Sequence, residues 1–223
     1  MLASGLTKRF SRGAETVTAL DGVELAVDGG QVVALVGPSG SGKSTLLALL
    51  CGWAVPDAGS LRVGTGGDPR DQGWSELALV PQALGLVPDL SLADNVLLPA
   101  RLRDRRGRTG SAADPESRAN RLMTGFGLAH LADRYPHQAS LGEQQRAAVA
   151  RALVLRPALL LADEPTAHQD RGHADTLLDA LRDAAADGTA VLVATHDEVA
   201  WARADRVVAL QDGRVVPRVG PAA

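Results

Sequence analysis

Apolar and polar residues along the chain follow two patterns, one with a period of two and one with helical spacing. Residues 20–27 alternate between polar and apolar, which predicts a half-buried strand, and residues 32–36 are all apolar, which predicts a buried one. Leucines then recur at helical spacing over 43–53. Short apolar runs at 158–162 and 190–194 predict two further strands. Strands that alternate with helices predict an α/β fold with a parallel sheet covered on both faces.

A long helical block separates these strands. From residue 92 to 156, leucines and alanines recur at three- and four-residue spacing. A stretch rich in Arg, Gly, Ser and Pro interrupts the block at 104–116 and predicts a loop. We therefore expect a single domain over residues 1–223, with a core at 1–82 and 157–223 and an inserted helical subdomain at about 83–156.

The composition narrows the classes of function. The formal net charge is −3, so nothing indicates the basic face that nucleic-acid binding needs. Charged residues, glycines or prolines interrupt every apolar stretch before the ~18 residues that a membrane-spanning helix needs. The first residues lack the apolar run of a secretory signal, and Cys51 is the only cysteine. We expect a cytoplasmic protein with no membrane span and no nucleic-acid partner.

The sequence GPSGSGKST fits the phosphate-loop pattern G-x-x-x-x-G-K-[ST] and lies between a predicted buried strand and a predicted helix. Gly40 and Gly42 let main-chain N–H groups approach a polyphosphate closely. Lys43 is expected to reach the β- and γ-phosphates, and the Ser44 hydroxyl is expected to coordinate Mg²⁺. A glycine-rich turn that binds nothing is the alternative, which the flanking elements disfavour. The expected nucleotide ligands in this loop are Gly37, Pro38, Ser39, Gly40, Ser41, Gly42, Lys43, Ser44 and Thr45.

Two adjacent carboxylates, Asp163 and Glu164, end the apolar run ALLLADE. In an open parallel sheet this is the carboxyl edge, where ligands bind. Asp163 is expected to hold Mg²⁺, and Glu164 is expected to polarise the attacking water. A strand followed by two carboxylates is common by itself. The phosphate loop upstream makes the catalytic interpretation the preferred one.

The segment from Tyr135 to Leu153, YPHQASLGEQQRAAVARAL, followed by LLLADEPT, resembles the signature region of ATP-binding cassette (ABC) ATPases. The resemblance extends over nearly the whole chain. It implies a P-loop NTPase fold with a RecA-like parallel-sheet core, an N-terminal antiparallel β part and the inserted helical subdomain. The residues that match the family's motifs are Phe10, Gln82, Ser140 to Glu143, Asp163, Glu164, Asp170 and His196.

The resemblance also implies a role for each matching residue. Phe10 would stack on adenine, although ordinary packing stays open for a single Phe. Gln82 would lie near Mg²⁺ and the attacking water and would report the nucleotide to a partner. His196 would donate to the γ-phosphate and orient Glu164. The expected Mg²⁺ ligands are Ser44, Gln82 and Asp163, and the expected catalytic residues are Glu164, His196 and Gln82.

In this family the signature serine and glycines bind the γ-phosphate held by the other subunit, so that two chains form two shared sites. Ser140 and Gly142 match this pattern, and Ser140 is a good N-cap for the predicted helix. Leu141 replaces the first signature glycine, which costs on the order of 1 to 2 kcal/mol if the position needs a positive φ or a tight approach to phosphate. Residues 167–169 of the D-loop also depart from the family pattern. The hydrolysis rate therefore stays open.

The region between Phe10 and Leu20, the segment LADNVLLPARL and the segment YPHQ are similar to the ATPases of lipoprotein-releasing and macrolide-exporter systems. The leading hypothesis is an ATP-hydrolysing motor for a separate integral membrane permease, peripheral on the inner face of the cell membrane. It would act as a homodimer or with a second ABC ATPase. The sequence does not separate this hypothesis from a mechanical signalling ATPase whose membrane partner transports nothing. A cassette that acts on DNA or ribosomes is disfavoured by the acidic balance.

Overall fold

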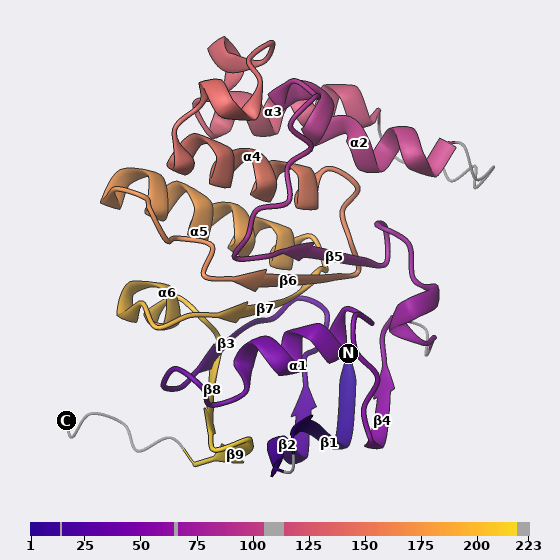
Figure 1. The fold of residues 1–223 in the computed structure, drawn as a ribbon. Helices are drawn as coiled ribbons and strands as arrows, with labels where there is room; N and C mark the ends of the chain where they lie inside the picture. The colour runs from indigo at the N-terminus through magenta and orange to yellow at the C-terminus, as the bar shows by residue number, and fades with distance from the viewer. Residues whose placement is uncertain (14, 65–66, 105–113, 218–223) are drawn as a thin grey trace.

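A central sheet organises the computed structural model, which describes residues 1–13, 15–64, 67–104 and 114–217 (Figure 1). Within those ranges, the strand order of this sheet is β5-β6-β7-β3-β8-β9. The first five are parallel, and β9 pairs antiparallel with β8. The strands are β3 (Val32–Val36), β5 (Leu77–Val80), β6 (Leu159–Asp163), β7 (Ala190–Ala194), β8 (Arg206–Gln211) and β9 (Arg214–Val216). The predicted parallel sheet is confirmed.

A second, antiparallel sheet contains β1 (Leu2–Arg12), β2 (Glu15–Ala26) and β4 (Ala58–Arg62) in the order β2-β1-β4. The predicted strand at 20–27 covers only the second half of β2. The first half was missed although Thr16 to Ala19 alternate between polar and apolar; its side chains are mostly exposed, so burial does not follow that alternation. Register shifts in the pairing of β1 with β2 interrupt the period of two along β1, so no pattern predicted that strand.

Alternate residues of the central strands face two different hydrophobic clusters. In β6, Leu159 and Leu161 belong to the cluster that contains the leucines of α1 (Lys43–Leu50). Leu160 and Ala162 belong to the cluster that contains residues of α4 (Leu141–Leu153) and α5 (Arg171–Ala186). Both faces of β6 are therefore buried, as a wholly apolar run predicts. Helix α1 is shorter than the predicted 43–53, because Gly52, the residue after the C-cap Cys51, takes a φ of +77°.

Three helices are inserted between β5 and β6: α2 (Leu92–Asp104), α3 (Pro115–Gly125) and α4 (Leu141–Leu153). Figure 1 shows them together at the top of the molecule, and α4 packs against both α5 and β5. The side chains from Gln145 to Leu153 are all buried, because α4 lies inside the larger cluster. Most of the predicted loop at 104–116 lies outside the described residues.

The remaining helical elements are short. Helix α6 (Glu198–Ala202) follows β7, and single 3-10 turns cover Pro69–Asp71, Ala129–Leu131 and Pro136–Gln138. None of the helices in the described part of the chain combines the length and apolar character that crossing a membrane requires.

Candidate nucleotide-binding site

A cleft of about 710 Å³ opens where β3, β6 and β7 end. This is the edge at which open α/β sheets bind ligands. Most of the predicted ligand and catalytic residues line it, together with a second group that the motifs did not include. The first group is Gly37, Pro38, Ser39, Gly40, Gly42, Lys43, Ser44, Thr45, Gln82, Asp163, Glu164 and His196, and the second is Val17, Thr18, Ala19, Asp212 and Gly213.

The glycines of the phosphate loop are required by its backbone and by its neighbours. Gly42 has a φ of +106°, and a Cβ there would lie 2.5 Å from the carbonyl oxygen of Ala19. A Cβ on Gly37 would lie 2.1 Å from the carbonyl oxygen of Leu210. Gly40 has a φ of +80°, but a Cβ there would meet nothing within 4 Å. The loop is therefore packed tightly on one side and open on the other.

The side chain of Lys43 binds the main chain of the phosphate loop. Its Nζ donates to the carbonyl oxygens of Gly37 at 2.7 Å and Pro38 at 3.1 Å. Because α1 begins at Lys43 and no described side chain caps it, the first N–H groups of the helix are available to an anion. The helix dipole adds positive potential at the same point. The loop thus presents an ammonium group and main-chain donors to the cleft.

Oxygen ligands that suit Mg²⁺ converge beside the loop. Ser44, Gln82 and Asp163 all line the cleft, and Ser44 is close enough to Asp163 to favour its charged form. Burial, and then the nearby charge of Glu164, raise the pKa of Asp163 above its ordinary value. A hydroxyl, an amide oxygen and a carboxylate are hard donors of the kind that Mg²⁺ prefers. The predicted metal ligands are therefore brought together and fit the ion.

Glu164 directly follows β6 and has an unusual backbone. Its φ is +50°, a left-handed conformation that non-glycine residues rarely adopt. Its N–H donates to the carbonyl oxygen of Ala194 at 2.9 Å, and its own carbonyl oxygen accepts from Nε2 of Gln145 at 2.7 Å. The surrounding chain therefore holds this residue in its strained conformation.

The carboxylate of Glu164 is held at both oxygens. Nδ1 of His196 lies 2.7 Å from Oε1, and Thr195 donates from Oγ1 to Oε2 at 3.1 Å. The hydrogen bond with Glu164, and then the charge of Glu164, raise the pKa of His196 above its ordinary value. The His196 side chain is 80% exposed, whereas that of Glu164 is 15% exposed. The predicted contact between His196 and Glu164 is thus present.

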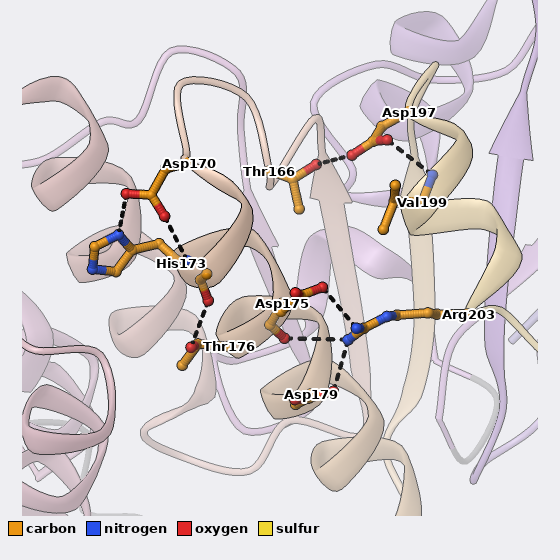
Figure 2. Close-up of polar contacts among 10 residues, drawn as sticks. Thr166, Asp170, His173, Asp175, Thr176, Asp179, Asp197, Val199 and Arg203 are labelled. Atoms are coloured by element: carbon orange, nitrogen blue, oxygen red, sulfur yellow. Dashed lines mark hydrogen bonds and ion pairs between the residues drawn. The ribbon is translucent and has the colours of Figure 1, made fainter.

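The loops around this pair are tied to each other and to the helices. Oγ1 of Thr166 donates to Oδ2 of Asp197 at 3.1 Å, which joins the loop after β6 to the loop after β7 (Figure 2). Arg203 binds carboxylates of α5, as Figure 2 also shows. Asp170, the predicted D-loop residue, caps α5 by accepting from the N–H of His173 at 2.9 Å.

Phe10 lies on β1 and is not among the residues that line the cleft. Its ring is 47% exposed, and Nζ of Lys8 lies 5.6 Å from the ring centroid. Phe10 pairs in register with Val17, which does line the cleft. The assignment of Phe10 to adenine remains a prediction, and the residues from Val17 to Ala19 provide the β2 side of the cleft.

Ser140 and Gly142 lie at the start of α4 and do not line the cleft of their own chain. Oγ of Ser140 accepts from the N–H of Glu143 at 3.3 Å, and Oε2 of Glu143 accepts from the N–H of Ser140 at 2.7 Å. This reciprocal arrangement is a capping box, so the predicted N-cap is confirmed. The Gly142 carbonyl oxygen accepts from Nε2 of Gln169 at 2.9 Å, which joins the signature to the D-loop.

The first of the two conditions for a cost at Leu141, a positive φ, is not met. Leu141 is the first residue of α4 and has a helical backbone, with the capping box directly before it. Its side chain is 47% exposed. An α-helical φ is negative for every residue type, so leucine is compatible with this position. Leu141 would therefore carry an energetic cost only if the closed dimer brings its side chain tightly against a phosphate.

Sequence reasoning missed Gln145, Thr195 and the turn at Asp212 and Gly213. Gln145 was interpreted only as part of a helix, and Thr195 only as the end of a strand. A signal existed for the turn, because Asp-Gly between two apolar runs is typical of a hairpin. A Cβ on Gly213 would lie 2.8 Å from the carbonyl oxygen of Ala19, so this turn packs closely against β2.

The phosphate loop, the oxygen ligands and the carboxylate–histidine pair together define a nucleotide-binding site of the P-loop class. The ABC transporter family model matches residues 20–167. The chain is 41% identical over 227 residues to the lipoprotein-releasing system ATP-binding protein LolD of Gluconobacter oxydans, covering 96% of this chain and 94% of that protein. It is 42% identical over 219 residues to LolD 1 of Rhodospirillum rubrum, covering 95% of each chain.

A dimeric structure of the ATP-binding cassette MJ0796, in a post-hydrolysis state bound to ADP and Pi, superposes with a TM-score of 0.85 at 30% identity. That alignment covers 96% of this chain and 95% of the other. The macrolide export ATP-binding/permease protein MacB of Burkholderia thailandensis is 40% identical over 220 residues, and this chain spans 33% of its length. The protein belongs to the ABC transporter family and is an ATP-binding cassette ATPase.

Proposed function

We propose that this chain binds Mg·ATP in the cleft and hydrolyses it to drive a separate membrane permease. The observation that carries the proposal is the convergence of Lys43, Asp163 and the Glu164–His196 pair in one cleft. Lys43 and the start of α1 would hold the phosphates. Ser44, Gln82 and Asp163 would hold Mg²⁺, which when bound neutralises charge on the β- and γ-phosphates.

Glu164 would accept the proton of the attacking water. Both of its carboxylate oxygens are already held, so its orientation is set before ATP enters. His196 is exposed to the cleft and would keep Glu164 in place while it donates toward the γ-phosphate. Because this arrangement acts by position and charge, loss of the Glu164 carboxylate should stop turnover and leave binding intact.

Two chains would share two sites. Ser140 and Gly142 lie outside the cleft of their own chain, at the start of a buried helix. A capped helix N-terminus is a ready site for a phosphate offered by a second subunit. The dimeric structures of MJ0796 support this arrangement. The second subunit would be another copy of this chain or a second ABC ATPase.

The membrane partner would bind a groove of about 580 Å³ beside the cleft. Its lining includes Trp74, Leu98 and Trp53, whose side chain is 71% exposed. Pro81 and Ala83 line the groove on either side of Gln82, which lines the nucleotide cleft. A movement of Gln82 in the nucleotide cleft would therefore shift Pro81 and Ala83, which would contact a partner in the groove.

This partner would place the chain at the inner face of the cell membrane. We also propose that residues 1–82 and 157–223 form the core and that about 83–156 form a helical subdomain that moves with the partner. A signalling role, in which the partner transports nothing, is the alternative. The shared ancestry with LolD and MacB favours the transport role, because both names describe release or export systems.

The test is the Glu164→Gln variant, with Glu198→Gln on α6 as the control. Glu164→Gln should reduce ATP hydrolysis to background and give an ATP-dependent dimer by sizing chromatography, since the amide keeps the shape but cannot take a proton. Glu198→Gln should hydrolyse ATP as the unchanged protein does. Full hydrolysis by Glu164→Gln would overturn the catalytic assignment, and a monomer with ATP would overturn the shared site.

A further inference from the structure

Thr195 connects the strand that leads into the phosphate loop with Glu164. Its side chain is fully buried, at 0% exposure, directly after β7. Its N–H donates to the carbonyl oxygen of Leu35 in β3 at 3.1 Å. Its Oγ1 donates to Oε2 of Glu164 at 3.1 Å. A single buried residue therefore contacts both the strand that leads into the phosphate loop and the expected base.

The direction of the Thr195 hydroxyl is determined by its neighbours. The N–H of Asp197 donates to Oγ1 of Thr195 at 3.0 Å. A hydroxyl has one proton and two lone pairs, so the Oγ1 that accepts from Asp197 still has its proton for Glu164. The two hydrogen bonds therefore point the same way: the N–H of Asp197 donates to Thr195, and the hydroxyl of Thr195 donates to the Glu164 carboxylate.

Asp197 is itself fixed, which makes this chain of hydrogen bonds rigid. Its Oδ2 accepts from Thr166, and its Oδ1 accepts from the N–H of Val199 at 2.9 Å at the start of α6 (Figure 2). His196 lies between Thr195 and Asp197 and takes the other oxygen of Glu164. The carboxylate is therefore held on one side by an exposed imidazole and on the other by a buried hydroxyl.

We propose that Thr195 is a positioning residue for ATP hydrolysis, which holds the Glu164 carboxylate in the orientation that accepts the proton of water. This inference rests on the proposed role of Glu164. The buried hydroxyl keeps Oε2 in place when His196 turns toward a bound phosphate. Without the hydroxyl, Glu164 retains one exposed contact and rotates away from the productive orientation.

The main variant is Thr195→Val, which keeps the shape and removes the hydroxyl. It should lower kcat about tenfold, a loss equivalent to ~1.4 kcal/mol in the barrier, with KM for ATP and the affinity for a non-hydrolysable analogue unchanged. Thr195→Ser should restore most of the rate. Thr195→Ala provides the same test if the valine variant does not fold.

Thr189→Val is the matched control, because Thr189 lies at the opposite end of β7, is 5% exposed and donates from Oγ1 to the carbonyl oxygen of Pro157 at 2.8 Å. Thr189→Val should lower the stability of the protein but leave kcat equal to that of the unchanged protein. Equal losses of kcat in Thr189→Val and Thr195→Val would show a general effect of the strand and would overturn the proposal.

A second measurement separates this proposal from the role of Glu164. In a Glu164→Asp background, whose shorter carboxylate can still take a proton but no longer reaches the Thr195 hydroxyl, Thr195→Val should cause no further loss in single-turnover hydrolysis, because Thr195 acts only through its contact with Glu164. A further tenfold loss there would overturn the positioning role. If Glu164→Gln hydrolyses ATP at the full rate, the proposed function fails. If Glu164→Gln is inactive but Thr195→Val retains full kcat, the Thr195 proposal fails alone.

Discussion

The side-chain amide of Gln145 donates to the main-chain carbonyl oxygen of Glu164 at 2.7 Å. Gln145 is 3% exposed and lies on α4, the helix that has the signature residue Ser140 as its N-cap. Glu164 has the strained φ of +50°. The helix that would contact the nucleotide of a second subunit is therefore attached directly to the expected base of its own site.

Gln145→Leu should lower ATP hydrolysis about tenfold and leave ATP affinity unchanged. The substitution keeps the buried volume but leaves the Glu164 carbonyl oxygen without its donor, which costs roughly 1 to 3 kcal/mol and releases the strained backbone. Steady-state kinetics and calorimetry with a non-hydrolysable analogue measure the two effects. The control is Gln72→Leu, which loses the bond from Nε2 to the carbonyl oxygen of Asp68. Normal turnover by Gln145→Leu would show that this bond is not needed for catalysis.

Lys43→Ala should weaken ATP binding on the order of 100-fold or more, because it removes a cation aimed at two phosphates. It also removes the two hydrogen bonds to Gly37 and Pro38 that shape the loop. Titration calorimetry with a non-hydrolysable ATP analogue gives the affinity. Arg101→Ala removes a cation that pairs with Asp94 on α2 and should bind ATP normally. Undiminished affinity in Lys43→Ala would place the phosphates elsewhere.

Leu141→Gly and Leu141→Ala should strengthen ATP-driven dimerisation to a similar extent in the Glu164→Gln background. The helical backbone of Leu141 removes any special requirement for glycine, so only the bulk of the exposed side chain opposes closure. Monomer affinity for ATP should not change. Sizing chromatography over a range of ATP concentrations measures dimerisation.

An improvement with glycine alone would contradict this steric explanation and indicate a backbone change on closure. No improvement with either variant would show that the dimer accommodates Leu141. If improvement appears only after a second cassette is added, the natural partner is a different protein with its own signature.

Glu143→Ala should lower the free energy of unfolding by ~1 kcal/mol at neutral pH, since it removes half of a capping box. Hydrogen bonds from the N–H and then the hydroxyl of Ser140 lower the pKa of Glu143 below its ordinary value. A lowered folded-state pKa stabilises the fold above the unfolded pKa, and the stabilisation is lost as the pH falls through the folded pKa.

The stability difference between Glu143→Ala and the unchanged protein should therefore shrink below about pH 4. Urea unfolding at a series of pH values measures it. Glu116→Ala is the comparison: Glu116 also lies in a first turn, on α3, where Asp114 supplies the cap. A difference for Glu143→Ala that stays constant down to pH 2 would contradict the assigned role of its charge.

The sequence by itself determined the phosphate loop, the strand that ends in Asp163 and Glu164, and the parallel sheet. Each depends on residues that are contiguous in the chain. The strands are short apolar runs, and the glycine spacing of the loop is set by the backbone angles that it needs. The resemblance to ABC ATPases then placed Gln82 and His196 beside these residues. The structure brings both into the same cleft.

Only the tertiary structure decided how Glu164 is held and what surrounds it. Its contacts with Gln145 and Thr195 join segments far apart in the chain, and a glutamine in a helix or a threonine after a strand has no pattern that identifies its acceptor. The helical backbone of Leu141 depends on the capping box before it, and the place of Phe10 depends on the register of β1 with β2. Local patterns report burial and turn chemistry, whereas these features arise from the packing of distant elements, which no single segment of the chain encodes.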